Sequence, residues 1–156
     1  MSSSITDRLY RRIMMLVAPV KITATDDTGP VHRAQIRGFP PETIDAMPVL
    51  QIYGLASHAM VGSDAMAIFT SGDRSNGVVI ATGNQQYRLR NLKSGEVALY
   101  DNGGNVVKLA NGGKIEITCP HDITIKCDTL SINADTSITL TSPKVTVKSG
   151  NFESMA

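Results

Sequence analysis

The sequence predicts an all-β chain: a short N-terminal helix, then an OB-like barrel, then an intertwined trimeric β-helix, that is, a triangular β-prism. Helical spacing of apolar residues is confined to the first nineteen residues. Five short strand-like segments, separated by turns rich in Gly, Pro, Asp and Asn, follow in residues 20–83. From Lys114 onward, a beat of apolar, polar and apolar residues recurs every seven or eight residues. We therefore divide the chain into a helical arm (1–19), a barrel (20–83), a connector with an antiparallel meander (84–113) and a needle (114–156).

The helical arm reads "SSSITDRLYRRIMMLVAPV". Ser4 and Asp7 have the spacing of a helix-start signal, and Pro19 is expected to end the helix. Apolar residues from Ile5 to Val17 fall on one face, with most of the charged residues elsewhere. Such a helix can pack on its own domain or a sister subunit, lie on a membrane, or dock to a larger partner.

The barrel strands are expected at residues 20–25, 31–36, 49–56, 65–70 and 77–82, with residues 37–48 as a loop. Asn76-Gly77 is interpreted as a hairpin turn. The stretch around it, "GDRSNGVV", lacks the Gly-Lys-Ser/Thr ending and the following helix of a phosphate-binding loop. Tyr87, Arg88, Arg90 and Lys93 are too sparse for a nucleic-acid surface and predict a solvated connector.

Asn-Gly-Gly at 102–104 and at 111–113 separates three apolar pairs and predicts an antiparallel meander. The beats of the needle then place polar residues outward, four of them with short hydroxyl side chains, at Glu116, Thr124, Ser131, Thr139 and Thr146. One such ribbon has an apolar face that nothing covers, whereas three copies can close a dry prism. At the spacing of neighbouring strands, five beats build about 25 Å of stalk. The expected trimer core is Ile115, Ile117, Ile123, Ile125, Leu130, Ile132, Ile138, Leu140, Val145 and Val147.

With these features, and above all with "GDRSNGVVIATGNQQYRLRNLKSGEVALYDNGG", the chain resembles the family of Mu-like phage baseplate assembly protein V, the central tail spike. The resemblance implies a homotrimer at the tail tip of the virion, assembled in the host cytoplasm. It would bind baseplate hub and tail-tube proteins and be driven through the host outer membrane as the sheath contracts. The N-terminal residues Ile5, Leu9, Arg11, Arg12 and Ile13 are then the expected hub-docking residues.

The resemblance raises the question of a metal at the needle apex, where many members hold iron through a His-x-His motif. His32, His58 and His121 do not form that motif, so we expect no metal or other cofactor within these residues and an apex iron only if the needle continues beyond Ala156. His121 is expected to face solvent. Cys119 and Cys127, one repeat apart, are interpreted as small buried hydrophobes, with a disulfide or metal ligands as the alternative.

Two other functions compete with a structural spike. A cell-wall-degrading spike enzyme needs paired carboxylates, and the only loop candidates, Glu42 and Asp45, are better explained by a surface loop or a helix turn. An OB-fold module for nucleic acid needs clustered basic and aromatic residues. The chain instead has 15 basic and 14 acidic residues, 4% aromatic residues, and Phe39, Tyr53 and Phe69 scattered. We therefore expect no catalytic residues and no specific binding of nucleic acid. No secretory signal or membrane span is expected either.

Overall fold

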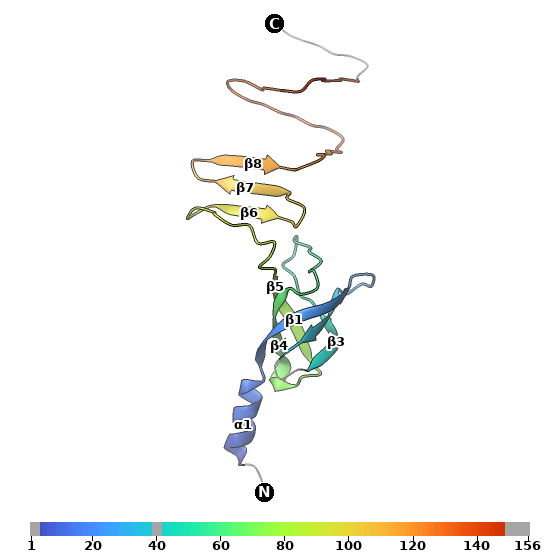
Figure 1. The fold of residues 1–156 in the computed structure, drawn as a ribbon, viewed down its shortest axis with the longest axis vertical. Helices are drawn as coiled ribbons and strands as arrows, with labels where there is room; N and C mark the ends of the chain where they lie inside the picture. Colours follow the sequence, from blue (N-terminus) through green and yellow to red (C-terminus); the bar gives the residue numbers. More distant parts are fainter. Residues whose placement is uncertain (1–3, 39–41, 149–156) are drawn as a thin grey trace. The chain divides into compact units, whose positions relative to one another are not determined.

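The computed structural model describes residues 4–38 and 42–148 and divides into two units, Met1–Pro120 and His121–Ala156. Phe39, one of the aromatic residues considered above, lies outside the described residues, as does the end of the expected needle. The helices and strands belong to the first unit (Figure 1). No helix among the residues described has the length and apolar character needed to cross a membrane.

Helix α1 spans Ile5–Met14 and begins with the expected capping box. The Ser4 side chain accepts a hydrogen bond from the Asp7 backbone N–H, and the Asp7 carboxylate accepts one from Ser4 N, both at 3.2 Å. The expected helix end at Pro19 is wrong, because Pro19 lies inside strand β1 (Val17–Asp26). Pro19 is paired there with Met66 of β4, while pairing with β2 starts only at Lys21. A residue without an N–H fits where one side of the strand has no partner.

The first sheet is antiparallel, with the order β3-β2-β1-β4-β5. Its remaining strands are β2 (Arg33–Arg37), β3 (Thr43–Pro48), β4 (Asp64–Phe69) and β5 (Gly77–Gly83). Just beyond β3, Val49 forms a single parallel bridge with Val79 of β5, so the two edge strands of the sheet approach each other. Alternate residues point into the core, which consists of Val20, Ile22, Ala34, Ile36, Met47, Ala65, Ala67, Phe69 and Val79.

Four of the five expected barrel strands are confirmed, but the third was placed wrongly. It was expected at residues 49–56, whereas the strand is β3, within the expected loop. A bulge in β3 interrupts the alternation of apolar and polar residues by which a strand is recognised. Ile36 is paired with Ile44, but Ala34, two residues earlier, is paired with Met47, three residues later. Within this bulge Ala46 has a φ of 56°. Pro48 is tolerated because β3 is the last strand of the sheet order.

The expected hairpin at Asn76-Gly77 is confirmed as a connection between antiparallel strands, although it is longer than a two-residue turn. A 3₁₀ turn, η1 (Thr70–Gly72), follows β4, and Thr70 N donates to Asn76 O at 2.8 Å. Gly77 is required by packing, because a Cβ at this position would lie 2.6 Å from the Phe69 ring.

The meander is confirmed as a three-stranded antiparallel sheet in the order β6-β7-β8. Its strands are β6 (Val97–Tyr100), β7 (Val106–Ala110) and β8 (Lys114–Thr118), and β8 contains the first beat of the needle. The structure assigns no strand to residues 121–148 of the second unit, and Figure 1 draws them as a chain without arrows. A lone ribbon has no neighbouring strand to hydrogen-bond with, so a single chain gives these beats no strand partners.

Candidate functional site: uncovered apolar faces

The three-stranded sheet carries an apolar grid of six exposed side chains on one face. Val97, Leu109 and Ile115 form one row across the strands, since their Cα atoms are register partners. Leu99, Val107 and Ile117 form the second row. All six are exposed, and Ile115 keeps 70% of its surface in contact with solvent. Nothing in the described chain covers this face, so it offers an extended apolar contact surface.

The opposite face of the same sheet is mixed, because charged side chains alternate there with Ala98, Val106 and Ala110. Ala98, Lys108 and Glu116 form its central row, and Lys108 Nζ lies 2.9 Å from Glu116 Oε2. The hydrogen bond to Glu116 raises the pKa of Lys108 above its ordinary value. The charged pair lies on this mixed face, whereas the six side chains of the apolar grid are all apolar and exposed.

The turn between β6 and β7 fixes the register that builds the grid. The Asp101 carboxylate accepts hydrogen bonds from Gly103 N (2.9 Å), Asn105 N (2.9 Å) and Asn105 Nδ2 (2.6 Å). These bonds, led by the one from the Asn105 side chain, lower the pKa of Asp101. Gly104, with a φ of 89°, takes the left-handed conformation that the tight reversal requires.

The needle positions continue the apolar pattern into the second unit. The side chains of the ten expected trimer-core residues are all exposed in the single chain, from Ile115 and Ile117 to Val145 and Val147. Cys127 is exposed and Cys119 is partly exposed, and both are free. The prediction that the cysteines are buried therefore fails for a single chain, because burial at these positions requires something to cover the ribbon. His121 is exposed, as predicted.

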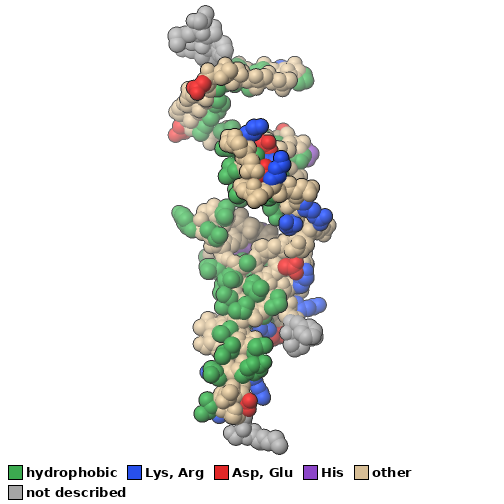
Figure 2. Space-filling model, turned by 90° about the vertical axis from the view of Figure 1, so that its left-hand side faces the viewer, with side chains coloured by type: hydrophobic (Ala, Val, Ile, Leu, Met, Phe, Trp, Pro, Cys, Tyr) green, Lys and Arg blue, Asp and Glu red, His purple; other side chains and the backbone are tan. Residues whose placement is uncertain are grey.

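Helix α1 presents a second uncovered stripe. Ile5, Leu9 and Ile13 are spaced four residues apart and exposed, and no residue of the helix is buried. Figure 2 shows apolar side chains gathered over the helix and the adjoining five-stranded sheet. Arg11 and Arg12 lie in the last helical turn, and the ion pairs found among residues 4–38 and 42–148 do not include them. The helix therefore combines an apolar stripe with unpaired positive charge.

The candidate catalytic carboxylates are engaged separately. Glu42 Oε2 lies 2.5 Å from Arg74 Nη2, and Arg74 in turn stacks on the Phe69 ring at 4.2 Å. Asp45 accepts a hydrogen bond from Gln35 Nε2 at 2.5 Å. Each carboxylate therefore stabilises the sheet through its own partner, and the two do not form a paired acid and base.

Histidines contribute one contact that the sequence reasoning missed. The rings of His32 and His58 meet edge to face, with their centroids 5.2 Å apart. No signal in the sequence links these residues. His32 directly precedes β2, and His58 lies in the connection between β3 and β4, just after the wrongly expected strand at residues 49–56. Within the described part of the chain, no three His, Cys, Asp or Glu residues cluster as metal ligands would. In the connector, Arg88, Arg90 and Lys93 are exposed.

Comparison with known proteins yields two matches. A family model described as "Bacteriophage Mu Gp45, N-terminal" matches residues 20–86, which include the five-stranded sheet from Val20 onward. The chain is also 27% identical over 138 residues to a protein of Escherichia phage Mu named "Baseplate puncturing device gp45". That alignment covers 88% of this chain, and the chain spans 66% of the length of the relative.

Proposed function

We propose that this chain, a member of the Mu-like baseplate spike family, is the central baseplate spike of a contractile phage tail. In this role it pierces the host outer membrane when the sheath contracts and so opens the way for the genome. The observation that carries the proposal is the uncovered apolar grid, whose pattern continues through the needle positions. The name of the phage Mu relative, a puncturing device of the baseplate, supports the same role.

The working form is a homotrimer. A single ribbon with one exposed apolar face cannot offset the entropy of its own ordering, whereas three copies related by three-fold symmetry cover one another. In the trimer, residues 114–156 form the intertwined β-helix, and the ten apolar needle residues line its dry core. Backbone hydrogen bonds between copies supply the strand partners that the single chain lacks. The result is a stiff rod, which suits a mechanical role.

The base of the spike is an OB-like barrel. The sheet order β3-β2-β1-β4-β5 and the parallel bridge between Val49 and Val79 support this assignment, because they bring the two edge strands together. Helix α1 docks to the baseplate hub through the stripe of Ile5, Leu9 and Ile13, with Arg11 and Arg12 beside it. The spike belongs to the virion and sits at the tip of the tail, next to hub and tail-tube proteins.

The protein is structural and not an enzyme. Between the end of β5 at Gly83 and the start of β6 at Val97, there is no room for a lytic domain. Glu42 pairs with Arg74 of the β4–β5 connection, and Asp45 accepts a hydrogen bond from Gln35 of β2. We assign no cofactor to these residues and no specific nucleic-acid surface, since the basic residues of the connector are sparse.

Mass measurement in solution tests the assembly. One chain has a mass of 16.7 kDa, and light scattering coupled to gel filtration is expected to give three times this mass. The circular dichroism spectrum is expected to be of β type, and the trimer is expected to resist denaturant. A stable monomer at micromolar concentration would refute the proposal. The role is tested by complementing a phage that lacks its spike: virions regain infectivity with this chain, and lytic activity on purified cell wall stays absent.

A further inference from the structure

The five-stranded sheet is apolar on part of its outer face, the face turned away from the core. In β1, β4 and β5, residues that alternate with the core residues form two rows across the strands, because their Cα atoms are register partners. The first row is Val17, Ile68 and Val78, and the second is Pro19, Met66 and Ala81. None of these six residues is buried, and none is charged. We call them the outer patch.

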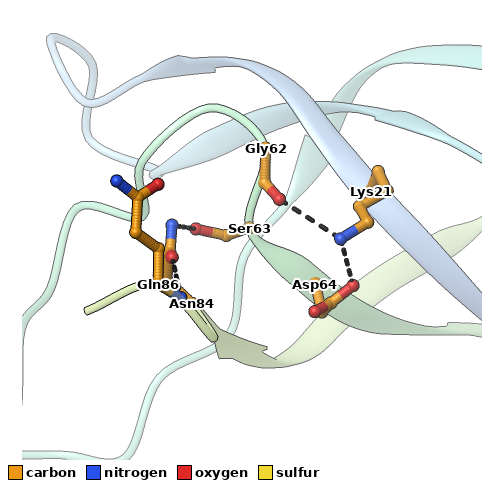
Figure 3. A network of polar contacts seen from close by, with 6 residues as sticks. All are labelled: Lys21, Gly62, Ser63, Asp64, Asn84 and Gln86. Carbon is orange, nitrogen blue, oxygen red and sulfur yellow. Dashed lines mark hydrogen bonds and ion pairs between the residues drawn. The ribbon is translucent and has the colours of Figure 1, made fainter. Parts of the chain in front are cut away.

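The outer patch has clear limits on the sheet. Over β2 the residues that point outward are all polar, namely Arg33, Gln35 and Arg37. On β1 and β4 the row that follows the outer patch consists of a charged pair, in which Lys21 Nζ lies 2.5 Å from Asp64 Oδ1 (Figure 3). The apolar character is therefore specific to one part of the outer face, and a polar edge borders it.

Helix α1 continues the outer patch. Its stripe of Ile5, Leu9 and Ile13 advances four residues at a time, and the next step is Val17, the first residue of β1. Figure 2 shows apolar side chains over the helix and over the five-stranded sheet on the same face. A contiguous apolar surface of this kind marks an interaction site, unlike apolar residues that are scattered singly.

The helix is held against the sheet by backbone contacts. Phe69 N, at the end of β4, donates to Leu16 O, just after the helix, at 2.7 Å. Gly72 of η1 lies so close to the helix that a Cβ on it would be 2.6 Å from Arg12 O. Because these contacts position the helix before any partner arrives, docking costs little conformational entropy.

Three arginines border the apolar stripe of the helix. One hollow is lined by Ile5, Leu9 and Met15 together with Arg8, Arg11 and Arg12. The ion pairs found among residues 4–38 and 42–148 include none of the three arginines. A partner that places carboxylates against them gains attraction, whereas a second copy presenting the same helix would bring like charges together. A helix beside a pleated sheet also needs a partner of complementary shape, which favours a protein over a bilayer.

We propose that helix α1 and the outer patch form one docking surface for a baseplate protein with an apolar face edged by Asp and Glu. This inference rests on the proposed hub docking of α1 and extends the contact to β1, β4 and β5. The apolar rows supply the buried centre of the contact, and the arginines at its edge orient the partner. None of the ten trimer-core residues belongs to this surface, so docking and trimer formation do not compete.

Attachment to purified tails tests the surface in the full-length chain. Labelled spike is mixed with phage tails assembled without a spike, and the bound fraction is measured after sedimentation. Ile68→Asp places a carboxylate in the outer patch, whereas Val31→Asp places one at an exposed apolar residue outside it. We expect Ile68→Asp to lower attachment about tenfold or more, as the loss of an anchor residue does, and Val31→Asp to leave it unchanged.

Leu9→Asp separates this inference from the proposed function. If the wild-type chain does not attach, the proposed hub docking itself fails. If Leu9→Asp lowers attachment while Ile68→Asp, still folded by circular dichroism, attaches like the wild type, the helix docks alone and the outer patch is refuted.

Charge reversal tests the acidic edge of the partner. The double variant Arg11→Glu and Arg12→Glu is compared with Arg88→Glu and Arg90→Glu, which changes two exposed arginines of the connector. We expect only the first pair to weaken attachment, and attachment of the wild-type chain to fall as salt is added. Equal effects of the two pairs would refute the assigned charge of the partner.

Photo-crosslinking identifies the occupant without adding a charge to the sheet. A benzophenone amino acid replaces Ile68, and mass spectrometry is expected to find the crosslink in a baseplate protein, within a segment that contains Asp or Glu. Crosslinks only to another copy of this chain would make the outer patch a contact between copies. Binding to vesicles of anionic phospholipid that Ile68→Asp abolishes would make it a membrane contact. Either result would overturn the proposal.

Discussion

A single charge in the needle gives the sharpest test of the proposed spike, and Ile125 is the best position for it. In one chain, Ile125 keeps 65% of its surface exposed, so Ile125→Asp costs the isolated chain almost nothing. In the proposed trimer the same side chain would be covered. Complete burial of an isoleucine contributes about 1.5–3 kcal/mol, and 65% of that is about 1–2 kcal/mol per copy, or about 3–6 kcal/mol for three copies.

The charge adds a larger penalty. Each carboxylate carried into a water-free core costs several kcal/mol, and the three copies also repel one another. The sum exceeds the net stability of about 5–15 kcal/mol that is typical of folded proteins. Light scattering is therefore expected to find Ile125→Asp as a monomer whose five-stranded sheet remains folded by circular dichroism.

Thr124→Asp is the matched control, because it places the same charge at the neighbouring residue on the other face of the ribbon. Its side chain stays in water in the proposed trimer, so the trimer should persist with a nearly unchanged denaturant midpoint. The same comparison holds for Ile132→Asp and Ser131→Asp. If both kinds of variant form equally stable trimers, the prism assignment is wrong.

Three further predictions concern the parts that support the needle. The pKa of Asp101 is lowered in the folded chain, so its carboxylate stabilises the β6–β7 turn fully above the unfolded pKa of 3.8, and this stabilisation is lost as the pH falls through the lower folded pKa. Hydrogen exchange at the amides of the turn should therefore become faster at low pH. Asp101→Ala should remove this pH dependence. Gly77→Ala should destabilise the five-stranded sheet by about 1–3 kcal/mol in denaturant titration, because its Cβ meets the Phe69 ring at 2.6 Å, whereas Gly83→Ala, with open space around it, should be neutral. Leu9→Asp on helix α1 should leave the trimer intact and prevent its incorporation into tails; normal incorporation would remove the docking role of the helix.

Sequence reasoning succeeded where local chemistry decides the structure. The capping box at Ser4, the glycine turns of the meander and its register all follow from residues close together in the chain. It failed where contacts between distant residues decide. The bulge at Ala46 is a shift in the pairing of β3 with β2, and Pro19 is tolerated because β1 changes partners along its length.

The connection between β3 and β4, residues 49–63, illustrates the same limit. Its run of apolar residues has the composition of a buried strand, and composition alone cannot distinguish a strand from an exposed loop. What makes it a loop is a set of side-chain bonds, from Gln51 to Ser57 and from His58 to Thr25, that no periodicity encodes. The exposure of its apolar side chains, such as Ile52 and Tyr53, could therefore be recognised only from the structure.

The two sheets differ in how the same alternation of residues is covered, and this difference supports the proposed assembly. In both sheets, apolar and polar residues alternate along the strands with a period of two. In the five-stranded sheet the alternate residues Ile22, Ile36, Phe69 and Val79 are buried by the curl of the sheet itself. In the three-stranded sheet the alternate residues are as apolar, yet all of them remain exposed, because three strands are too few to curl over their own face. A chain that repeats this second pattern to residue 147 leaves these apolar side chains uncovered, and contacts between copies would cover them in the proposed trimer.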